Sequence, residues 1–427
     1  MTHDPAAQTS SGLPAWVVRL WQDRALRTGL VLFLLLRLLT GLVAVVGVDP
    51  AHPVGAPFYQ MAGDPGADRA TDTYGGVYPA GGLLRALTWP WFVWDTHYYV
   101  SIASAGYDVH PRTAVFPPLY PALIAGVGGL SGDDVLAAIL VGNAACLLMI
   151  VLLIKLVAAE TGDEQAARWS AIWLLAFPTA YYFFAPYTES LFLALVLGAW
   201  LAARGRRYWL GGVLACLAAL TRTQGLVLVA PFGYMVLRAS GIWAEGRVRL
   251  ERLPALLKAT PLLLGAPLGW GLHFAGSVAL GYGSPAAVMR DAWFIQTLWP
   301  WDAVAGNLQM MVQTGITDVM DVFNPATLLA AALLLLPVLR RLPLEYALYS
   351  LGTLAVILTR LPDVLPFTSA SRYVLTVFPL FIVIALLLRP PEGDSRWRRL
   401  ARFGLLELSL LCQVVLLAKY VRWIFIA

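Results

Sequence analysis

The chain has 427 residues, of which 59% are hydrophobic and 13% charged, and its mean hydropathy is +0.70. A soluble domain of this length needs a much larger charged surface, so the composition indicates an all-α polytopic integral membrane protein. The net charge of +5 suits basic cytoplasmic loops, and no basic cluster is interleaved with aromatic residues as in nucleic-acid binders. The three cysteines lie inside apolar runs, which argues against a disulfide framework and a cysteine metal site.

The first predicted element is a transmembrane helix over residues 28–48. Arg19, Arg24 and Arg27 precede this run, which is longer than the apolar core of a signal peptide and lacks a small-residue cleavage site. Because basic residues flank the cytoplasmic ends of membrane helices, the N-terminus is expected in the cytoplasm and the loop after the helix outside.

Apolar segments that are candidates to cross a membrane recur along the rest of the chain. The expected spans are 28–48, 134–157, 168–186, 188–203, 208–222, 225–238, 257–280, 325–341, 343–361, 371–389 and 402–425. They make about eleven crossings, although several are shorter than the roughly 20 residues of a straight membrane helix. We expect one domain over 1–427, with a first outer loop at 49–133 that carries interfacial helices and a second outer loop at 281–325.

The segment Leu119–Leu130 decides the topology, because it is apolar but short and rich in glycine. If it stays in the outer leaflet, the later basic clusters all fall inside; if it spans, they fall outside. We therefore expect a helix that does not cross. Lys419 and Arg422 run against the rule at the outer end of the last helix, and Arg37 in the first helix has no assigned place. The outer face then collects these polar residues: Asp95, His97, Glu189, Arg222, Arg290, Asp291 and Arg372.

The segment from Trp91 to Pro121 places a lone acid, Asp95, among many aromatic residues. A carboxylate beside a membrane is expensive, which makes Asp95 a candidate functional residue. The alternative is an amphipathic interfacial helix whose Asp95 and His97 simply face water. An inverting glycosyl transfer needs one base for the acceptor hydroxyl and cations for the leaving phosphate, and a single acid in this position suits the base.

The same segment resembles a known family. The motifs are Trp94-Asp95-x-His97-Tyr98, Ile102-Ala103-x-x-Gly106-Tyr107 and Phe116-Pro117-x-Leu119-Tyr120-Pro121. They are similar to those of the PIG-V-type mannosyltransferases, which are GT-C-fold enzymes with a polyprenyl-phosphate sugar donor. The resemblance implies a GT-C fold with membrane-parallel helices in the first outer loop. It also implies that Asp95 is catalytic and that Trp94, His97 and Tyr98 bind substrate.

A second segment, Ala185–Phe192, places Glu189 between two apolar helices and resembles the family's Tyr-x-Glu-Ser-Leu-Phe motif. An acid there must be paired or face water. We expect either a substrate-binding Glu189 or a purely structural helix start, with Thr188 as the N-cap and Glu189 in the first turn.

Two further segments carry an arginine. In Thr221–Gly225, Arg222 interrupts an apolar run, and the segment resembles the family's Arg-x-x-Gly break with Gln224 in place of the frequent asparagine. In Ser369–Tyr373, Arg372 and Tyr373 open a late helix, resembling the family's Arg-Tyr pair. The alternatives are an arginine that extends to the interface and an anchoring Arg–Tyr pair. The resemblance implies that Arg222 and Arg372 bind the donor phosphate and that Gln224 and Tyr373 bind substrate.

The loop Gly281–Trp301 weakly resembles the family's Gly-Asp-Pro loop, but Ser284 replaces the acid, so no catalytic role is carried over. Its tryptophans are expected as an aromatic belt, with sugar or lipid stacking as the alternative. Asp133 with Asp134 is expected at a helix start, and Asp163 with Glu164 in a cytoplasmic loop. No HxxxH or DxD pattern occurs, so neither a metal nor another cofactor is expected.

These features predict a multi-pass membrane mannosyltransferase, a metal-independent hexosyltransferase that inverts the sugar. It would move mannose from polyprenyl-phosphate-mannose to a lipid or glycan acceptor at the extracytoplasmic face, as a monomer among membrane lipids. The alternative is a transporter or flippase of lipid-linked sugars, which would distribute its functional charges across both leaflets. A non-catalytic scaffold descended from such an enzyme is a further alternative, which the intact Asp95 opposes.

Overall fold

The computed structural model describes residues 22–48, 82–109, 111–244, 247–363, 365–389, 395–422 and 424. Most of the predicted first outer loop before residue 82, together with Arg19, lies outside these ranges. The described chain is a helical bundle with only two short antiparallel sheets, β1 (Trp243–Ala244) with β2 (Arg247–Val248) and β3 (Ile295–Thr297) with β4 (Arg360–Pro362).

Five described helices are long and apolar enough to cross a membrane. They are α2 (Arg24–Gly47), α8 (Asp134–Thr161), α14 (Thr260–Ala279), α17 (Met320–Arg341) and α21 (Arg396–Val421). The shorter helices of the bundle are α9 (Glu164–Ala176), α10 (Glu189–Arg204), α11 (Tyr208–Ala219), α12 (Val229–Ser240), α18 (Leu344–Leu358) and α20 (Phe378–Leu388). The predicted all-α, multi-pass architecture is therefore confirmed, whereas the count of about eleven crossings stays a prediction.

Most of the remaining helices lie in the predicted loops. They are α5 (Gly82–Thr88), α6 (Asp95–Ala105), α7 (Leu119–Ser131), α13 (Leu253–Lys258), α15 (Pro285–Trp293) and α16 (Pro300–Thr314), whereas α19 (Ala370–Val374) lies in a predicted span. Short 3₁₀ segments occur between helices at Trp89–Trp91, Tyr107–Val109, Pro111–Val115, Ala180–Phe183, Thr223–Leu228 and Leu250–Arg252. Helix α7 has 13 residues, fewer than the roughly 20 of a straight membrane span, and its position in one leaflet stays a prediction.

Proline residues break two of the predicted spans. The span at 168–186 ends as α9 at Ala176, because Pro178 follows the C-cap residue Phe177 and disfavours a helical conformation there. The span at 371–389 is divided into α19 and α20, and Pro379 lies in the first turn of the second helix. Both breaks open room for non-helical segments inside the bundle.

Acidic caps and close-packed glycines hold the helices in place. Asp133 accepts hydrogen bonds from two backbone amides at the start of α8, and Asp163 does the same for α9. Helices α11 and α14 pack without intervening side chains, since a Cβ atom on Gly265 would lie 2.1 Å from the Gly212 carbonyl oxygen. Such close approach of small residues is typical of helix contacts in membranes.

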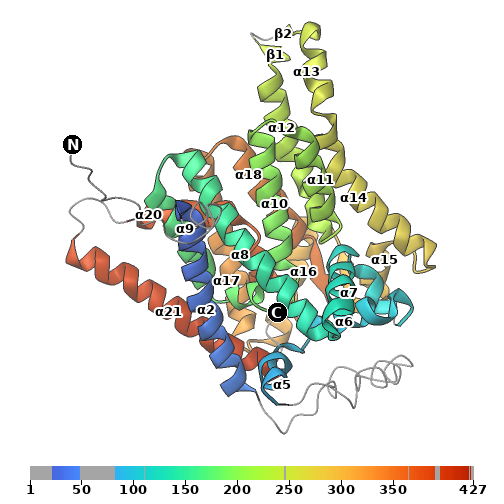
Figure 1. The fold of residues 1–427 in the computed structure, drawn as a ribbon, viewed down its shortest axis with the longest axis vertical. Coiled ribbons are helices and arrows are strands. Elements are labelled where there is room, and N and C mark those ends of the chain that lie inside the picture. The colour runs from blue at the N-terminus through green and yellow to red at the C-terminus, as the bar shows by residue number, and fades with distance from the viewer. Residues whose placement is uncertain are drawn as a thin grey trace, which may run out of the picture.

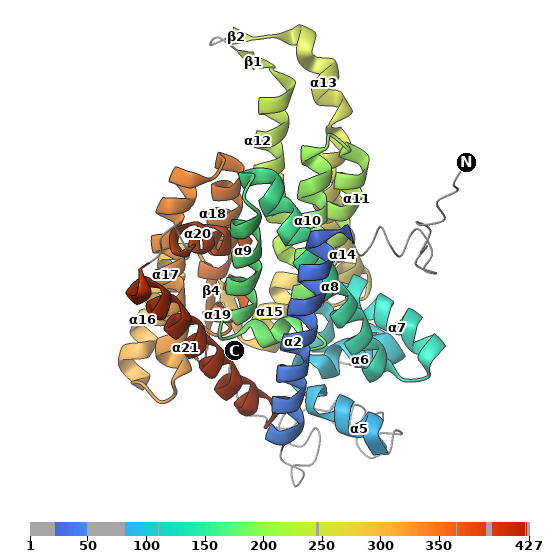
Figure 2. The same cartoon turned by 60° about the vertical axis from the view of Figure 1, so that its left-hand side comes forward.

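The bundle has two distinct ends (Figures 1 and 2). Helix α13 and the β1–β2 hairpin project from one end, while α5 and α6 lie at the other. The last turns of α10, α12 and α17 carry Arg204, Arg238 and the pair Arg340–Arg341 toward the projecting end, which we call the basic end. Because α10 runs from Glu189 to Arg204, its 16 residues separate the two ends by roughly 24 Å.

Candidate active site

Asp95, Glu189, Arg222 and Arg372 form one continuous network of ion pairs, which we call the charge network. Arg372 donates from Nη1 to Oδ2 of Asp95 at 2.8 Å and from Nε to Oε1 of Glu189 at 2.5 Å. Arg222 donates from Nη1 to the same Glu189 oxygen at 2.7 Å. The four predicted segments thus meet at one point, although Asp95 and Arg372 lie 277 positions apart.

Three members of the charge network are buried and the fourth is not. Glu189 is 0% exposed, Arg372 5% and Arg222 7%, whereas the Asp95 side chain is 20% exposed. Buried charges are tolerated only when they are paired and hydrogen-bonded, which these are. Asp95 is therefore the most accessible member of the charge network.

Tyrosines hold Arg372 and the start of α6 together. The Arg372 guanidinium lies 4.4 Å from the ring centre of Tyr187 and 4.9 Å from that of Tyr182. The Tyr187 hydroxyl in turn accepts a hydrogen bond of 3.0 Å from the Asp95 backbone amide. Trp94 donates from Nε1 to the Tyr420 carbonyl oxygen at 3.2 Å. These contacts position the Asp95 carboxylate against Arg372.

Arg222 is fixed by polar side chains as well as by Glu189. Its Nη1 donates to Thr188 Oγ1 at 2.8 Å, and its Nε donates to Gln224 Oε1 at 3.1 Å. The alternative that Arg222 extends to the interface is wrong, because Arg222 is too buried. Thr188 does hold the N-cap position of α10 with Glu189 in the first turn, as the structural alternative expects, but its side chain makes no capping hydrogen bond. The Thr188 hydroxyl contacts Arg222 and Tyr99 instead.

Unusual backbone conformations border the charge network. Trp94 has φ +54° immediately before Asp95, and Ser369 has φ +63° three residues before Arg372. A residue other than glycine in this region is held there by its surroundings, and such residues gather at functional sites. The strained turns aim the Asp95 and Arg372 side chains at each other.

His97 and Tyr98 do not join the charge network, which corrects the expectation that they face a substrate. His97 is 5% exposed, stacks on Phe92 with ring centres 3.9 Å apart and bonds the Phe92 carbonyl oxygen at 3.0 Å. Burial lowers its pKa to about 4, so the ring is neutral. Tyr98 packs against Phe116 and Trp293. Because residues two apart on a helix differ by about 200° in direction, Asp95 and His97 cannot face the same side.

Arg372 and Tyr373 are not an interfacial anchoring pair either, because Arg372 is buried. The Tyr373 ring lies within cation–π distance of three guanidiniums: Arg360 at 4.8 Å, Arg222 at 5.2 Å and Arg372 at 5.9 Å. Sequence reasoning missed Arg360 and placed it inside a predicted span. A signal was present, since Thr359-Arg360 ends an apolar run as Thr221-Arg222 does.

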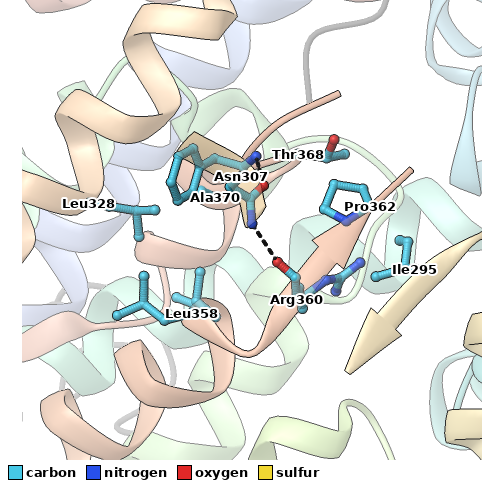
Figure 3. Close-up of a pocket in the computed structure, with 10 residues that line it drawn as sticks. Ile295, Asn307, Leu328, Leu358, Arg360, Pro362, Thr368 and Ala370 are labelled. Carbon is cyan, nitrogen blue, oxygen red and sulfur yellow. Dashed lines mark hydrogen bonds between the residues drawn. The ribbon is translucent and has the colours of Figure 1, made fainter. Parts of the chain in front are cut away.

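Arg360 opens strand β4, which pairs with β3 of the second outer loop. Figure 3 shows the Asn307 amide donating to the Arg360 carbonyl oxygen at 3.0 Å, beside Pro362 and Thr368. The cavity bordered by these residues has a volume of about 10 Å³. It has room for about one water molecule and none for a sugar.

The second outer loop has structural caps and an exposed aromatic pair. Ser284 caps α15 by accepting from the Ala287 amide at 3.1 Å, consistent with the absence of an acid there. Trp299 and Trp301 stack in parallel, with ring centres 5.3 Å apart, and are 68% and 66% exposed. Arg290 and Asp291 pair with each other and are exposed.

Arg37, which the sequence left without a place, lies beside the aromatic segment. Its guanidinium stacks over the Trp91 ring at 4.8 Å. Among the described residues, no three histidine, cysteine, aspartate or glutamate side chains gather as metal ligands.

No protein-family model matches the chain, and no curated protein matches it. The solved structure of ArnT from Cupriavidus metallidurans bound to undecaprenyl phosphate is similar, with 15% sequence identity and a TM-score of 0.45. The match covers 91% of this chain and 65% of the solved chain. A likeness this distant carries no argument about substrate or mechanism.

Proposed function

We propose that the protein is a GT-C glycosyltransferase of the PIG-V type. It transfers mannose, with inversion and without a metal ion, from polyprenyl-phosphate-mannose to a lipid or glycan acceptor at the outer face of the membrane. The observation that carries the proposal is the charge network, in which Asp95 is the exposed end of an otherwise buried set of carboxylates and guanidiniums. Its four members come from the four segments that resemble the family.

In this proposal Asp95 is the general base. The acceptor hydroxyl gives its proton to the Asp95 carboxylate while its oxygen attacks the anomeric carbon of the donor sugar. The bond between that carbon and the phosphate oxygen breaks, and both of its electrons leave with the phosphate. The donor phosphodiester carries one negative charge, and the polyprenyl phosphate that leaves carries a second.

The charge network accommodates that second negative charge. When Asp95 takes up the proton, its carboxylate is neutralised and no longer balances the Arg372 guanidinium 2.8 Å away. The positive charge of Arg372 is then available to the phosphate at the moment when the phosphate becomes more negative. The hydrogen bonds within the described site use Nε and Nη1 of both arginines and leave their Nη2 groups for a substrate.

The roles of the remaining side chains follow from their positions. Glu189 holds both arginines in the orientation in which their free Nη2 groups meet the donor, so it acts through Arg222 and Arg372. Gln224 and Tyr373 contact the same guanidiniums and shape the site around the sugar phosphate. Trp94, His97 and Tyr98 form the wall that supports Asp95.

Transfer of radiolabelled mannose from polyprenyl-phosphate-mannose in membranes tests the proposal. Wild-type membranes should transfer the label, and Asp95→Asn should lower the rate about a hundredfold or more, because the amide keeps the shape and removes the base. Asp108→Asn is the matched control, since Asp108 is exposed in the same loop region and lies outside the charge network. Near-normal transfer by the Asp95 variant would refute the assignment of the base.

Other polyprenyl-phosphate sugars, assayed in the same membranes, test the sugar separately. Transfer of another hexose with mannose rejected would keep the glycosyltransferase and remove the mannose specificity. If wild-type membranes transfer no sugar from any such donor, the proposed function itself is wrong.

A further inference from the structure

The charges around Tyr373 do not balance. Three guanidiniums, those of Arg222, Arg360 and Arg372, lie within 6 Å of its ring centre. Two carboxylates, Asp95 and Glu189, pair with Arg372 and Arg222. Among the described residues, three positive charges against two negative charges leave one net positive charge, and Arg360 is the arginine that pairs with no described carboxylate.

Arg360 makes only neutral contacts within the described part of the chain. Its Nη1 donates to the Tyr373 hydroxyl at 2.7 Å, and its guanidinium stacks over the same ring. Its side chain is partly exposed, unlike those of Arg222 and Arg372. A guanidinium held on an aromatic ring keeps most of its donors free and loses less water than one engaged by a carboxylate.

The backbone of Arg360 is rigid. Its residue pairs with Thr297 across the β3–β4 ladder, and its carbonyl oxygen accepts from Asn307 Nδ2 (Figure 3). The Asn307 side-chain oxygen accepts from the Phe367 amide at 2.6 Å. This arrangement joins two loops and fixes the arginine beside the charge network, as a preorganised binding group requires.

We propose that Arg360 binds the phosphate of the lipid-linked sugar donor and supplies the positive charge that Arg222 and Arg372 share with carboxylates. This inference rests on the proposed function. The net positive charge of the site matches the single negative charge of a phosphodiester donor. After transfer, the proton on Asp95 leaves the site with two net positive charges, which match the two negative charges of the polyprenyl phosphate product.

Inhibition of sugar transfer by polyprenyl phosphate, compared with uncharged polyprenol of the same length, tests the inference. In Arg360→Gln, the polyprenyl phosphate concentration for half inhibition should rise about tenfold or more, because a charge-assisted contact is lost. The effect of polyprenol should not change. The KM for the donor should rise by a similar factor.

Arg290→Gln is the matched control, because it removes an arginine that is exposed in the second outer loop and pairs only with Asp291. Its inhibition should equal that of the wild type. Arg360→Met, which keeps an apolar stem over the Tyr373 ring, is the second variant and should reproduce the glutamine result. Thermal unfolding of each purified variant reports folding.

The outcomes separate the two proposals. If wild type transfers sugar and either folded Arg360 variant is inhibited by polyprenyl phosphate as strongly as wild type, Arg360 does not bind the phosphate, while the proposed function stands. If the variant loses inhibition by polyprenol and polyprenyl phosphate alike, Arg360 supports the lipid site and not the phosphate. If wild type transfers no sugar and polyprenyl phosphate does not bind, the proposed function fails and the inference with it.

Discussion

The charge network and the basic end use the same residue types under opposite physical conditions. At the charge network, Arg372 and Glu189 have side chains that are 6% and 0% exposed. At the basic end, Arg389 pairs with Asp163, and these side chains are 49% and 24% exposed. Lys155 and Asp23 pair at 45% and 32% exposure.

The two ends therefore differ in what their charges can do. Exposed pairs contribute little to stability and are weakened by salt. Buried pairs are expensive to desolvate, and hydrophobic residues of similar size are often at least as stabilising. A buried network of four charges is best explained by chemistry.

The largest expected effect separates the two ends by compartment. Single cysteines are placed at Gly205, between α10 and α11, and at Gln313, near the end of α16, after the three native cysteines are replaced. An impermeant thiol reagent added outside should label position 313 fully and position 205 only after the membrane is opened. The physical reason is that the basic clusters stay in the cytoplasm.

Labelling of position 205 from outside would reverse this map. It would mean that α7 and its neighbours add a crossing, and the proposed outer-face reaction would then be wrong. Labelling of neither position in intact cells, with both labelled in opened membranes, would also contradict the outer-face site.

The next effect concerns stability and compares the same arginine-to-glutamine substitution at each end. Arg372→Gln leaves Asp95 and the fully buried Glu189 short of a partner, which should lower the free energy of unfolding by about 3–5 kcal/mol. Arg389→Gln removes an exposed pair and should cost about 1 kcal/mol or less. Thermal and denaturant unfolding of the purified proteins measure both.

Equal losses in the free energy of unfolding for Arg372→Gln and Arg389→Gln would show that the two ends do not differ in the stability of their ion pairs. A small loss for Arg372→Gln would show that water enters the charge network and solvates Glu189. High salt sharpens the test, since it should weaken the wild-type contribution of Arg389 and leave that of Arg372 nearly unchanged.

The segments of the site could be predicted from the sequence, because each interrupts an apolar run. Asp95, Glu189, Arg222 and Arg372 are polar groups among membrane helices, and such groups are expensive wherever they lie. Their pairing could not be predicted. A single sequence contains no information on which carboxylate meets which arginine across 277 positions.

His97 and Arg360 show which features of the site a sequence pattern does not predict. The family resemblance implies that His97 binds substrate, yet its position on α6 turns it toward Phe92. Arg360 is not predicted as a site residue, because the predicted span 343–361 includes it. The helix α18 in fact ends at Leu358, two residues before Arg360. Direction on a helix and helix ends depend on tertiary packing, which local patterns do not encode.

The smallest expected effect is that of removing metal ions, which should leave the rate of sugar transfer unchanged. Both carboxylates of the charge network are engaged by guanidiniums, and a metal ion would have to displace Arg372 from Asp95 to bind there. The site already carries a net positive charge, so binding a divalent cation there would be electrostatically unfavourable.

Mannose transfer should therefore continue at its full rate after EDTA treatment, and addition of Mg²⁺ or Mn²⁺ should not increase it. An assay in chelated buffer, with the chelator removed in a parallel sample, checks this. Loss of transfer that Mn²⁺ restores would refute the metal-independent reaction.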